Sequence, residues 1–208
     1  MTITAESWAE AANEMSARLV VGASLSAFVI YPKLDDMTYE SRGRAVTQIL
    51  PLTPEDIPEK AEVHARTWQE TYRGLLPDDL NDTITPQFAE DVTRRLTDLR
   101  TLVAKVDGRV VGYIAWSDRC RSHFSVDGAA EVCNLYVLQE FQGRGIGRAL
   151  LEAALSRIGG HDVVLSAFSS NEPALGFYEH VGFERTGATF DEGAMEETEL
   201  VLRASGGA

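Results

Sequence analysis

Apolar residues recur along this chain with two different spacings, and each change of spacing marks a new element. From residue 44 onward, short alternating or continuous apolar runs are typical of strands, whereas apolar residues at every third or fourth position are typical of helices. The resulting order is strand, two helices, three strands, helix, strand, helix and two strands. This order predicts an α/β domain with a mixed sheet. The segments are residues 44–52, 53–74, 85–100, 101–117 (a hairpin), 129–138, 145–158, 161–169, 171–182, 183–190 and 195–203.

Helix ends and turns are marked by residues with special backbone preferences. Thr53 and Thr85 each precede a proline, and a threonine N-cap followed by proline in the first turn is typical of a helix start. Asp107-Gly108 separates two alternating apolar runs and therefore predicts a tight hairpin turn. Gly159 is expected to close the helix that begins at Gly145.

The first 43 residues do not continue this pattern and are predicted to form an N-terminal extension of unknown role. The apolar stretch of residues 19–31 is shorter than the roughly 20 residues needed to span a bilayer. Acidic rather than basic residues precede it, so it is a poor signal peptide, and we expect a cytoplasmic protein without membrane contact. Residues 44–203 are predicted to form the main domain and residues 204–208 a disordered tail.

Composition and charge narrow the classes of partner. The 208 residues are 44% hydrophobic and 25% charged, which is ordinary for a globular protein with a core. A formal net charge of -13 repels nucleic acids and anionic lipids, and it suits a cationic substrate such as an amine. The two cysteines, Cys120 and Cys133, provide neither a disulfide framework nor a zinc spacing, and we expect no metal.

A glycine-rich loop, residues 142–148, lies between a predicted strand and a predicted helix. The first turn of a helix carries backbone N–H groups without internal partners, and glycines let a ligand approach them. The loop therefore predicts an anion cradle suited to a diphosphate. Arg144 and Arg148 either add positive charge to this cradle or are ordinary surface arginines. The glycine spacing fits neither the dinucleotide-binding nor the nucleoside-triphosphate pattern.

Two stretches resemble the GNAT superfamily of acetyl-CoA-dependent N-acetyltransferases. Residues 130–155, AEVCNLYVLQEFQGRGIGRALLEAAL, are similar to the acetyl-CoA motif of that family, and residues 169–187, SSNEPALGFYEHVGFERTG, are similar to the motif that follows it. The resemblance extends over about residues 44–203. It implies a GNAT fold, which is a mixed, mostly antiparallel sheet flanked by helices, with strands that splay at the acetyl-CoA site.

The resemblance also implies roles for particular residues. The strand residues Leu135, Tyr136 and Val137 would pair with the pantetheine arm, and Asn171 would contact the same arm. Tyr178 would protonate the departing thiolate, unless it is only a core aromatic residue. The backbone of the loop would hold the diphosphate, through Gln142, Gly143, Arg144, Gly145, Ile146, Gly147 and Arg148.

Acetyl transfer to an amine requires a neutral amine and a polarised carbonyl. A lysine-like amine has a pKa of about 10.4, so only about one in 10³ molecules is neutral at pH 7 and a base would help. Glu131 is the candidate base, with an exposed strand-end carboxylate as the alternative reading, and His123 and His64 are further candidates. The backbone N–H of Val137 could polarise the carbonyl oxygen.

The acceptor remains open between a small-molecule and a peptide amine. Trp68, Tyr72 and Arg73 fit either the wall of an acceptor pocket or the packing face of their helix. The acidic residues around Glu196 and Glu197 could attract a cationic amine, although solvated charge is the favoured reading. A homodimer is one open option for assembly. The functional alternatives are an acetyl-CoA-binding sensor or interaction module without turnover, and an acyltransferase that uses longer acyl chains.

Overall fold

The structure, a computed structural model, describes residues 47–74, 78–192 and 195–204. The predicted N-terminal extension of residues 1–43 therefore lies outside the described residues, as do residues 205–208 of the predicted tail. Ala204 is described, and its backbone N–H donates to Oδ1 of Asp162 at 2.7 Å.

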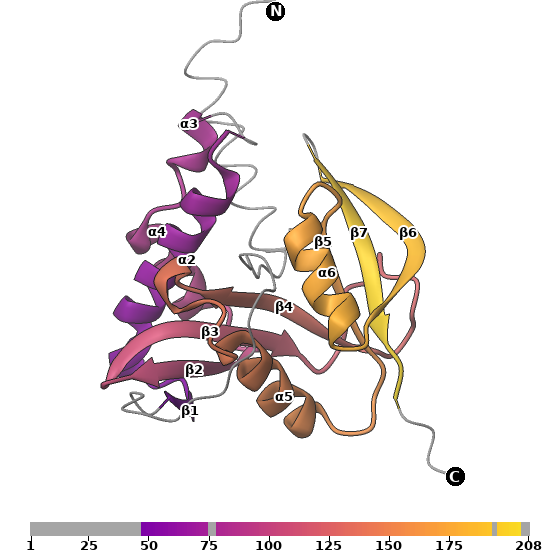
Figure 1. The fold of residues 1–208 in the computed structure, drawn as a ribbon, viewed down its shortest axis with the longest axis horizontal. Helices are drawn as coiled ribbons and strands as arrows, with labels where there is room; N and C mark the ends of the chain where they lie inside the picture. Colours follow the sequence, from indigo (N-terminus) through magenta and orange to yellow (C-terminus); the bar gives the residue numbers. More distant parts are fainter. Residues whose placement is uncertain (1–46, 75–77, 193–194, 205–208) are drawn as a thin grey trace, which may run out of the picture.

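Seven strands form one sheet in the order β1-β2-β3-β4-β5-β7-β6 (Figure 1). Among the strands that the structure describes, only β4 and β5 run parallel, and the other five neighbouring pairs are antiparallel. The prediction of a mixed, mostly antiparallel sheet is confirmed. The strands are β1 (Thr47–Pro51), β2 (Arg100–Val106), β3 (Arg109–Ser117), β4 (Ala130–Val137), β5 (Val163–Phe168), β6 (Glu184–Glu192) and β7 (Met195–Leu202).

The helices follow the predicted order with three local differences, one of which is the unpredicted 3-10 turn η2 (Gln139–Phe141). The first predicted helix starts with a 3-10 turn, η1 (Pro54–Asp56), and only then continues as α2. A one-turn helix, α3, was not predicted, because four residues are too few to display a helical spacing. The helices are α2 (Ile57–Tyr72), α3 (Asp78–Asn81), α4 (Pro86–Arg95), η2 (Gln139–Phe141, a 3-10 turn), α5 (Ile146–Ile158) and α6 (Glu172–His180).

The predicted hairpin turn at Asp107-Gly108 joins β2 to β3. Both residues have positive φ angles, +51° for Asp107 and +81° for Gly108. Two positive φ angles at the central positions give the turn whose twist matches that of antiparallel strands. The Asp-Gly pair therefore sets the register next to the turn, which shifts at a bulge between Ala104 and Lys105.

The two halves of the sheet separate between β4 and β5. These strands pair only at Ala130 with Val163 and at Glu131 with Val164, whereas β3 stays paired with β4 as far as Val137. In Figure 1 the strands β2 to β4 and the strands β5 to β7 accordingly run in different directions. The GNAT-type splay expected from the sequence is thus present, and it starts near Val132.

Helices cover both faces of the half-sheet that contains β3. Residues 110–116 of β3 are all buried, although successive side chains point to opposite faces. Both α2 and α5 contact β3 and β4, so each helix covers one face. On α5, the predicted apolar line of Ile146, Leu150 and Ala154 is buried against the sheet. The glycine loop at the start of α5 is thereby held beside the splay.

Candidate active site

The backbone of the glycine loop bends sharply just before α5. Gly143 has a φ of +69° and Gly145, the N-cap residue of α5, has a φ of +79°. L-residues with a side chain rarely adopt these angles. A Cβ built on either glycine would have no heavy atom within 4 Å. The glycines are therefore required by the backbone angles of the turn and not by close packing, because the space beside each α-carbon is open.

No side chain caps the N-terminus of α5, and none caps that of α2, whereas α4 and α6 are both capped. On α4, the Phe88 N–H donates to Thr85 Oγ1 at 3.2 Å, and on α6 the Ala174 N–H donates to Asn171 Oδ1 at 3.2 Å. Gly145 has no side chain that could do the same. The amides of the first turn of α5, together with the helix dipole, are thus directed at an external acceptor, which suits an anion.

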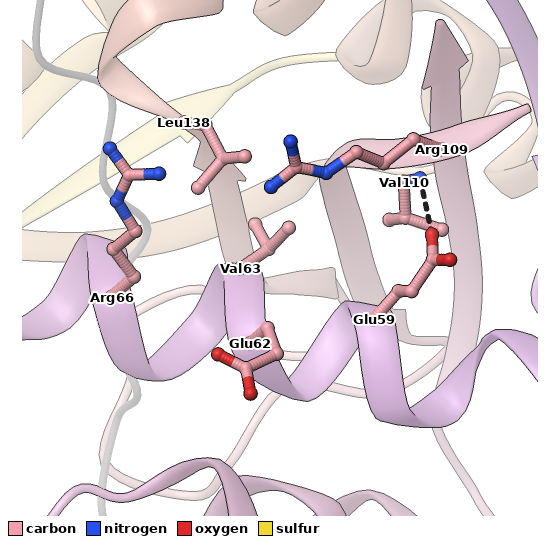
Figure 2. Close-up of a pocket in the computed structure, with 7 residues that line it drawn as sticks. All are labelled: Glu59, Glu62, Val63, Arg66, Arg109, Val110 and Leu138. Atoms are coloured by element: carbon pink, nitrogen blue, oxygen red, sulfur yellow. Dashed lines mark hydrogen bonds between the residues drawn. The ribbon is translucent and has the colours of Figure 1, made fainter. Parts of the chain in front are cut away.

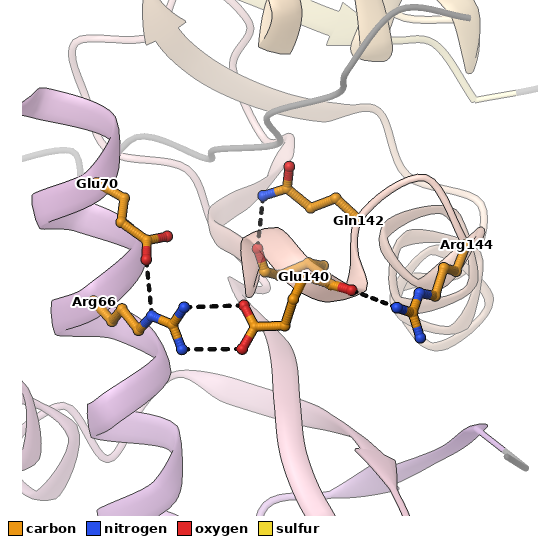
Figure 3. Close-up of polar contacts among 6 residues, drawn as sticks. Arg66, Glu70, Glu140, Gln142 and Arg144 are labelled. Atoms are coloured by element: carbon orange, nitrogen blue, oxygen red, sulfur yellow. Dashed lines mark hydrogen bonds and ion pairs between the residues drawn. The ribbon is translucent and has the colours of Figure 1, made fainter. Parts of the chain in front are cut away.

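Side chains of the loop stabilise its own backbone (Figure 3). Gln142 donates from Nε2 to the Val137 carbonyl at 2.9 Å, and Arg144 donates from Nη2 to the Glu140 carbonyl at 2.6 Å. Arg148 forms an ion pair with Glu152 one turn further along α5, at 2.7 Å. The loop side chains therefore act first as supports for the turn, and the candidate anion donors are its backbone amides.

A bidentate ion pair connects the loop to helix α2. The Arg66 guanidinium donates to both carboxylate oxygens of Glu140, at 3.0 and 3.1 Å, and to Glu70 at 2.8 Å (Figure 3). Glu140 belongs to η2, whose end leads directly into the glycine loop. This contact was not predicted, because its two partners lie 74 residues apart in the sequence.

The predicted pantetheine-binding strand residues Leu135, Tyr136 and Val137 lie in the part of β4 that β5 has left. All three are buried. Ile146 and Gly147 are buried too, at the start of α5. The structure thus brings together the end of β4 and the glycine loop, as the sequence predicted.

Asn171 is the N-cap of α6 and is 7% exposed. Its Oδ1 caps the helix, whereas its Nδ2 is buried and has no hydrogen-bond partner among the described residues. A buried amide donor without a partner is costly, and it fits a site that awaits an acceptor. Asn171 therefore has the geometry expected of a residue that donates to a ligand.

Tyr178 lies on α6 and is fully buried. Its ring packs edge-on against Phe177 and Phe183, with centroid separations of 5.1 and 5.6 Å. Tyr178 thus packs in the core, which was one of the two roles that the sequence left open for it. Its predicted role as an acid stays a prediction.

Glu131 is 2% exposed, so it is not the exposed strand-end carboxylate that was the alternative reading. Arg121 occupies both of its oxygens: the backbone N–H donates to Oε2 at 3.0 Å, and the guanidinium contacts Oε1 at 2.7 and 2.9 Å. Glu131 therefore anchors the segment between β3 and β4. It also lies in the last residue pair before the splay opens.

The predicted acceptor residues Trp68 and Tyr72 belong to one aromatic cluster. Their ring centroids lie 4.3 Å apart, and Tyr72 meets Phe168 of β5 edge-on at 5.2 Å. Arg73, the third candidate, instead has an exposed side chain that lies 3.8 Å from Asp82. The cluster connects α2 with the end of β5, across the splay.

The favoured reading of Glu197 as a solvated charge is wrong, because this side chain is fully buried. Glu199, two residues along β7, is also fully buried and accepts hydrogen bonds from the backbone and hydroxyl of Ser125. Strand alternation could not have found them, because residues 197–201 of β7 are buried on both faces. Residues 197, 199 and 201 share one face of β7, and a strand covered on both sides buries that face.

A buried polar group connects α2 with the sheet. His64 Nδ1 lies 2.6 Å from the Tyr113 hydroxyl, and burial together with the nearby Lys60 holds the pKa of His64 well below its usual value. Lys60 Nζ donates to Thr93 Oγ1 at 2.8 Å, and burial lowers its pKa to about 7. His64 is thus a neutral core histidine, while His123 is exposed in the segment that follows β3.

A cavity of about 320 Å³ opens between α2 and the adjoining ends of β3 and β4 (Figure 2). The Val110 N–H donates to Glu59 at 2.7 Å at one side of the cavity, and the Arg66 and Arg109 side chains extend over it. None of the predicted site residues lines it. The lining residues are Glu59, Glu62, Val63, Arg66, Arg109, Val110 and Leu138.

Within the described part of the chain, no helix is long and apolar enough to cross a membrane. The same residues contain no group of three or more histidine, cysteine, aspartate or glutamate side chains arranged to hold a metal ion. Cys120 and Cys133 are both free thiols.

Residues 97–185 match the acetyltransferase (GNAT) domain family. An uncharacterized N-acetyltransferase of Methanocaldococcus jannaschii is 34% identical over 85 residues, which cover 39% of this chain and 38% of that protein. The N-alpha-acetyltransferase RimI of Mycobacterium tuberculosis is 38% identical over 84 residues, which cover 40% of this chain and 51% of that protein. The chain thus spans about half or less of the length of these curated relatives.

Solved structures share the fold. A histone acetyltransferase HPA2 and related acetyltransferase of Corynebacterium glutamicum superimposes with a TM-score of 0.62 at 20% identity, covering 76% of this chain and 97% of that one. The PaiA N-acetyltransferase of Thermoplasma acidophilum, solved with coenzyme A, has a TM-score of 0.59 at 22% identity, with coverage of 74% and 98%. The splayed seven-stranded sheet defines the class as a GNAT fold. The match of residues 97–185 to the acetyltransferase (GNAT) domain family includes β4, the glycine loop and α6.

Proposed function

We propose that this protein transfers the acetyl group of acetyl-CoA to a primary amine, in a ternary complex of both substrates. The observation that carries the proposal is the uncapped N-terminus of α5 behind Gly143 and Gly145, beside the part of β4 that β5 has left. It supplies amides for a diphosphate and an open strand edge for a pantetheine arm, within the segment that matches the family.

Several groups of the chain are proposed to act on acetyl-CoA. The amides of residues 143–148 would bind its diphosphate, and the backbone of β4 from Leu135 to Val137 would pair with its arm. Asn171 Nδ2, which is buried without a partner among the described residues, would donate to the same arm. The substrate itself supplies a thioester carbonyl, and the Val137 N–H would stabilise the negative charge that develops on its oxygen.

The chemistry proposed is direct attack of the amine. The lone pair of the neutral amine forms a bond to the carbonyl carbon, and the carbon–sulfur bond breaks. The nitrogen, which is positively charged after the attack, then loses one proton and becomes the amide nitrogen. The departing thiolate takes a proton, for which Tyr178 is the proposed donor. Glu131 is the base proposed from the sequence, although Arg121 holds both of its oxygens.

That contact of Glu131 with Arg121 favours a second candidate function, an acetyl-CoA-binding sensor that does not catalyse transfer. Arg121 contacts both oxygens of Glu131, so an amine would have to displace Arg121 before it could reach this carboxylate. A sensor would need the glycine loop and β4 but no base.

One assay separates the two candidates. Acetyl-CoA binding is measured by calorimetry, and release of free thiol is followed with spermidine, 2-phenylethylamine, lysine and an alanine tripeptide as acceptors. The transferase predicts binding together with amine-dependent thiol release and an acetylated product. Binding without acetylation of any amine supports the sensor, and absence of binding contradicts both functions.

A further inference from the structure

Glu197 of β7 lies where the two half-sheets are farthest apart. Strand β5 pairs with β4 only through its first two residues, so its last residue, Phe168, is the residue of β5 most distant from the paired end. Phe168 is directly opposite Glu197 in the β5–β7 register. Opposite residues of antiparallel strands share a face, so these two side chains lie on the same side of the sheet.

That side of the sheet is the one that faces the aromatic cluster of α2. Phe168 meets the Tyr72 ring edge-on, and Tyr72 packs on Trp68. Phe190 of β6 lies opposite Glu197 on the other flank. The carboxylate is therefore flanked by aromatic residues on both neighbouring strands, and Trp68 and Tyr72 lie beyond Phe168.

The negative charge of Glu197 on β7 acts on tyrosines of two other elements, α2 and β4. Burial is the main cause that raises the pKa of Tyr72 and of Tyr136, and the negative charge of Glu197 contributes to both increases. Tyr72 belongs to α2, and Tyr136 belongs to the end of β4 that β5 has left, so the field of one carboxylate on β7 reaches both sides of the splay. Glu199, on the same face of β7, accepts hydrogen bonds from Ser125.

Two further buried atoms of this region point to a ligand. Trp68 Nε1 and His64 Nε2 are buried and have no hydrogen-bond partner among the described residues. The His64 ring lies 5.1 Å from the Tyr136 ring and 6.5 Å from the Trp68 ring. A buried polar atom without a partner is costly, so such atoms accumulate where a ligand will satisfy them.

We propose that Glu197, together with the aromatic side chains of Trp68, Tyr72 and Phe168, binds the ammonium group of the acceptor. A carboxylate flanked by aromatic side chains is a combination that can bind an organic cation. The acceptor is therefore a cationic primary amine, an inference that rests on the proposed function. The ammonium group transfers one proton to the Glu197 carboxylate, which leaves the lone pair on nitrogen free to attack the thioester.

The test compares acetylation kinetics of the wild-type protein with those of Glu197→Gln, Glu197→Asp and Glu196→Gln. The acceptor is the amine of the four-compound panel that is acetylated fastest. Glu196 is the next residue on the same strand and is exposed, so Glu196→Gln is a matched control. We expect Glu197→Gln to raise KM for the amine by at least about tenfold, as loss of a charged hydrogen-bond partner does, and to lower kcat, because the amide of glutamine cannot accept the ammonium proton. The Kd of acetyl-CoA should stay unchanged.

Glu197→Asp keeps the charge and is expected to recover part of the amine affinity, whereas Glu196→Gln should behave as the wild type does. Wild-type kinetics for Glu197→Gln would overturn the inference and leave the proposed function intact. Absence of acetylation by the wild-type protein with every amine would contradict both.

A measurement without a variant covers the case in which Glu197→Gln does not fold. In the wild-type protein, the ammonium form of a non-reacting analogue, the N,N-dimethyl derivative of the chosen amine, is compared as an inhibitor with the neutral alcohol of the same skeleton. We expect the cation to compete at least about tenfold better. Equal inhibition by the neutral alcohol would contradict a carboxylate that recognises charge.

Discussion

Gly145 and Gly159 stand at the two ends of α5, and both have a φ of +79°. Any side chain is strained at either position, so a substitution there costs about 1 kcal/mol or more of stability. Only Gly145 faces the corner assigned to the diphosphate. We predict that Gly145→Glu raises the Kd of acetyl-CoA by at least about tenfold, because a carboxylate replaces open space beside an anion.

Gly159→Glu is the control for Gly145→Glu, since it introduces the same side chain at the same φ on the same helix. It should lower thermal stability at least as much, because the ψ of -154° at Gly159 belongs to a region that almost only glycine adopts. It should leave the Kd of acetyl-CoA within about twofold of the wild-type value. Calorimetric titration of both folded variants checks the pair. Equal Kd values for the two variants would count against the assignment of the loop.

Tyr178 allows a prediction that separates packing from acid catalysis. Tyr178→Phe keeps the ring that packs on Phe177 and Phe183 and removes only the hydroxyl. We expect kcat to fall by about 10²-fold or more, the usual contribution of a general acid, while the Kd of acetyl-CoA stays unchanged. Steady-state kinetics with thiol detection provides the measurement, and an unaltered kcat would leave Tyr178 with a packing role alone.

At the residue scale, the sequence predicted backbone conformation at turns better than it predicted which side chains contact each other. The loop glycines and the Asp107-Gly108 turn could be predicted because positive φ angles leave a direct mark on residue type. The partner of Glu131 could not, since nothing in the local sequence directs Arg121 back onto it. Glu197 was misread for a related reason: its burial depends on strands and helices far away in the chain.

At the scale of elements, the packing of α2 on α4 encloses one ionisable group. Lys60 of α2 is buried beside Thr93 of α4, and its pKa falls from 10.5 to about 7 because its charged form is desolvated. Between these two pH values the unfolded chain binds one more proton than the folded protein does. The free energy of unfolding therefore rises with pH across this window, by about 1.4 kcal/mol per pH unit from this group.

Lys60→Met removes that dependence. We predict that this variant is more stable than the wild-type protein at pH 7 and that its advantage shrinks as the pH approaches 10. Urea denaturation of both proteins at pH 7, 8 and 9 measures the difference in free energy of unfolding. A difference that does not change with pH would mean that Lys60 stays protonated in the folded protein over this range.

Most elements could be predicted because their local signals agree with the tertiary structure. Thr85 caps α4 as its Thr-Pro sequence indicates, and Asn171 caps α6. The start of α2 shows the limit of such signals, since Thr53-Pro54 leads into a 3-10 turn before the helix begins at Ile57. The divergence of β4 from β5 leaves no local signal at all, and it was expected only through the resemblance to GNAT proteins.

At the scale of the whole molecule, the formal net charge of -13 gives the proposed reaction a dependence on ionic strength. An acidic protein attracts a cationic acceptor over a distance of about 10 Å at 0.1 M salt, and added salt screens that attraction. We predict that kcat/KM for a cationic amine falls several-fold between about 0.02 and 0.3 M sodium chloride. Initial rates at low amine concentration test this, and rates independent of salt would contradict a role for the acidic field.

The central claim is that the backbone amides at the start of α5 bind the diphosphate of acetyl-CoA, and a crystal structure of the full chain with coenzyme A tests it most directly. We predict diphosphate oxygens at about 2.7–3.2 Å from backbone nitrogens of residues 143–148, with the pantetheine arm along Leu135 to Val137. A diphosphate bound elsewhere on the molecule, with these amides satisfied by groups of the protein itself, would contradict the account.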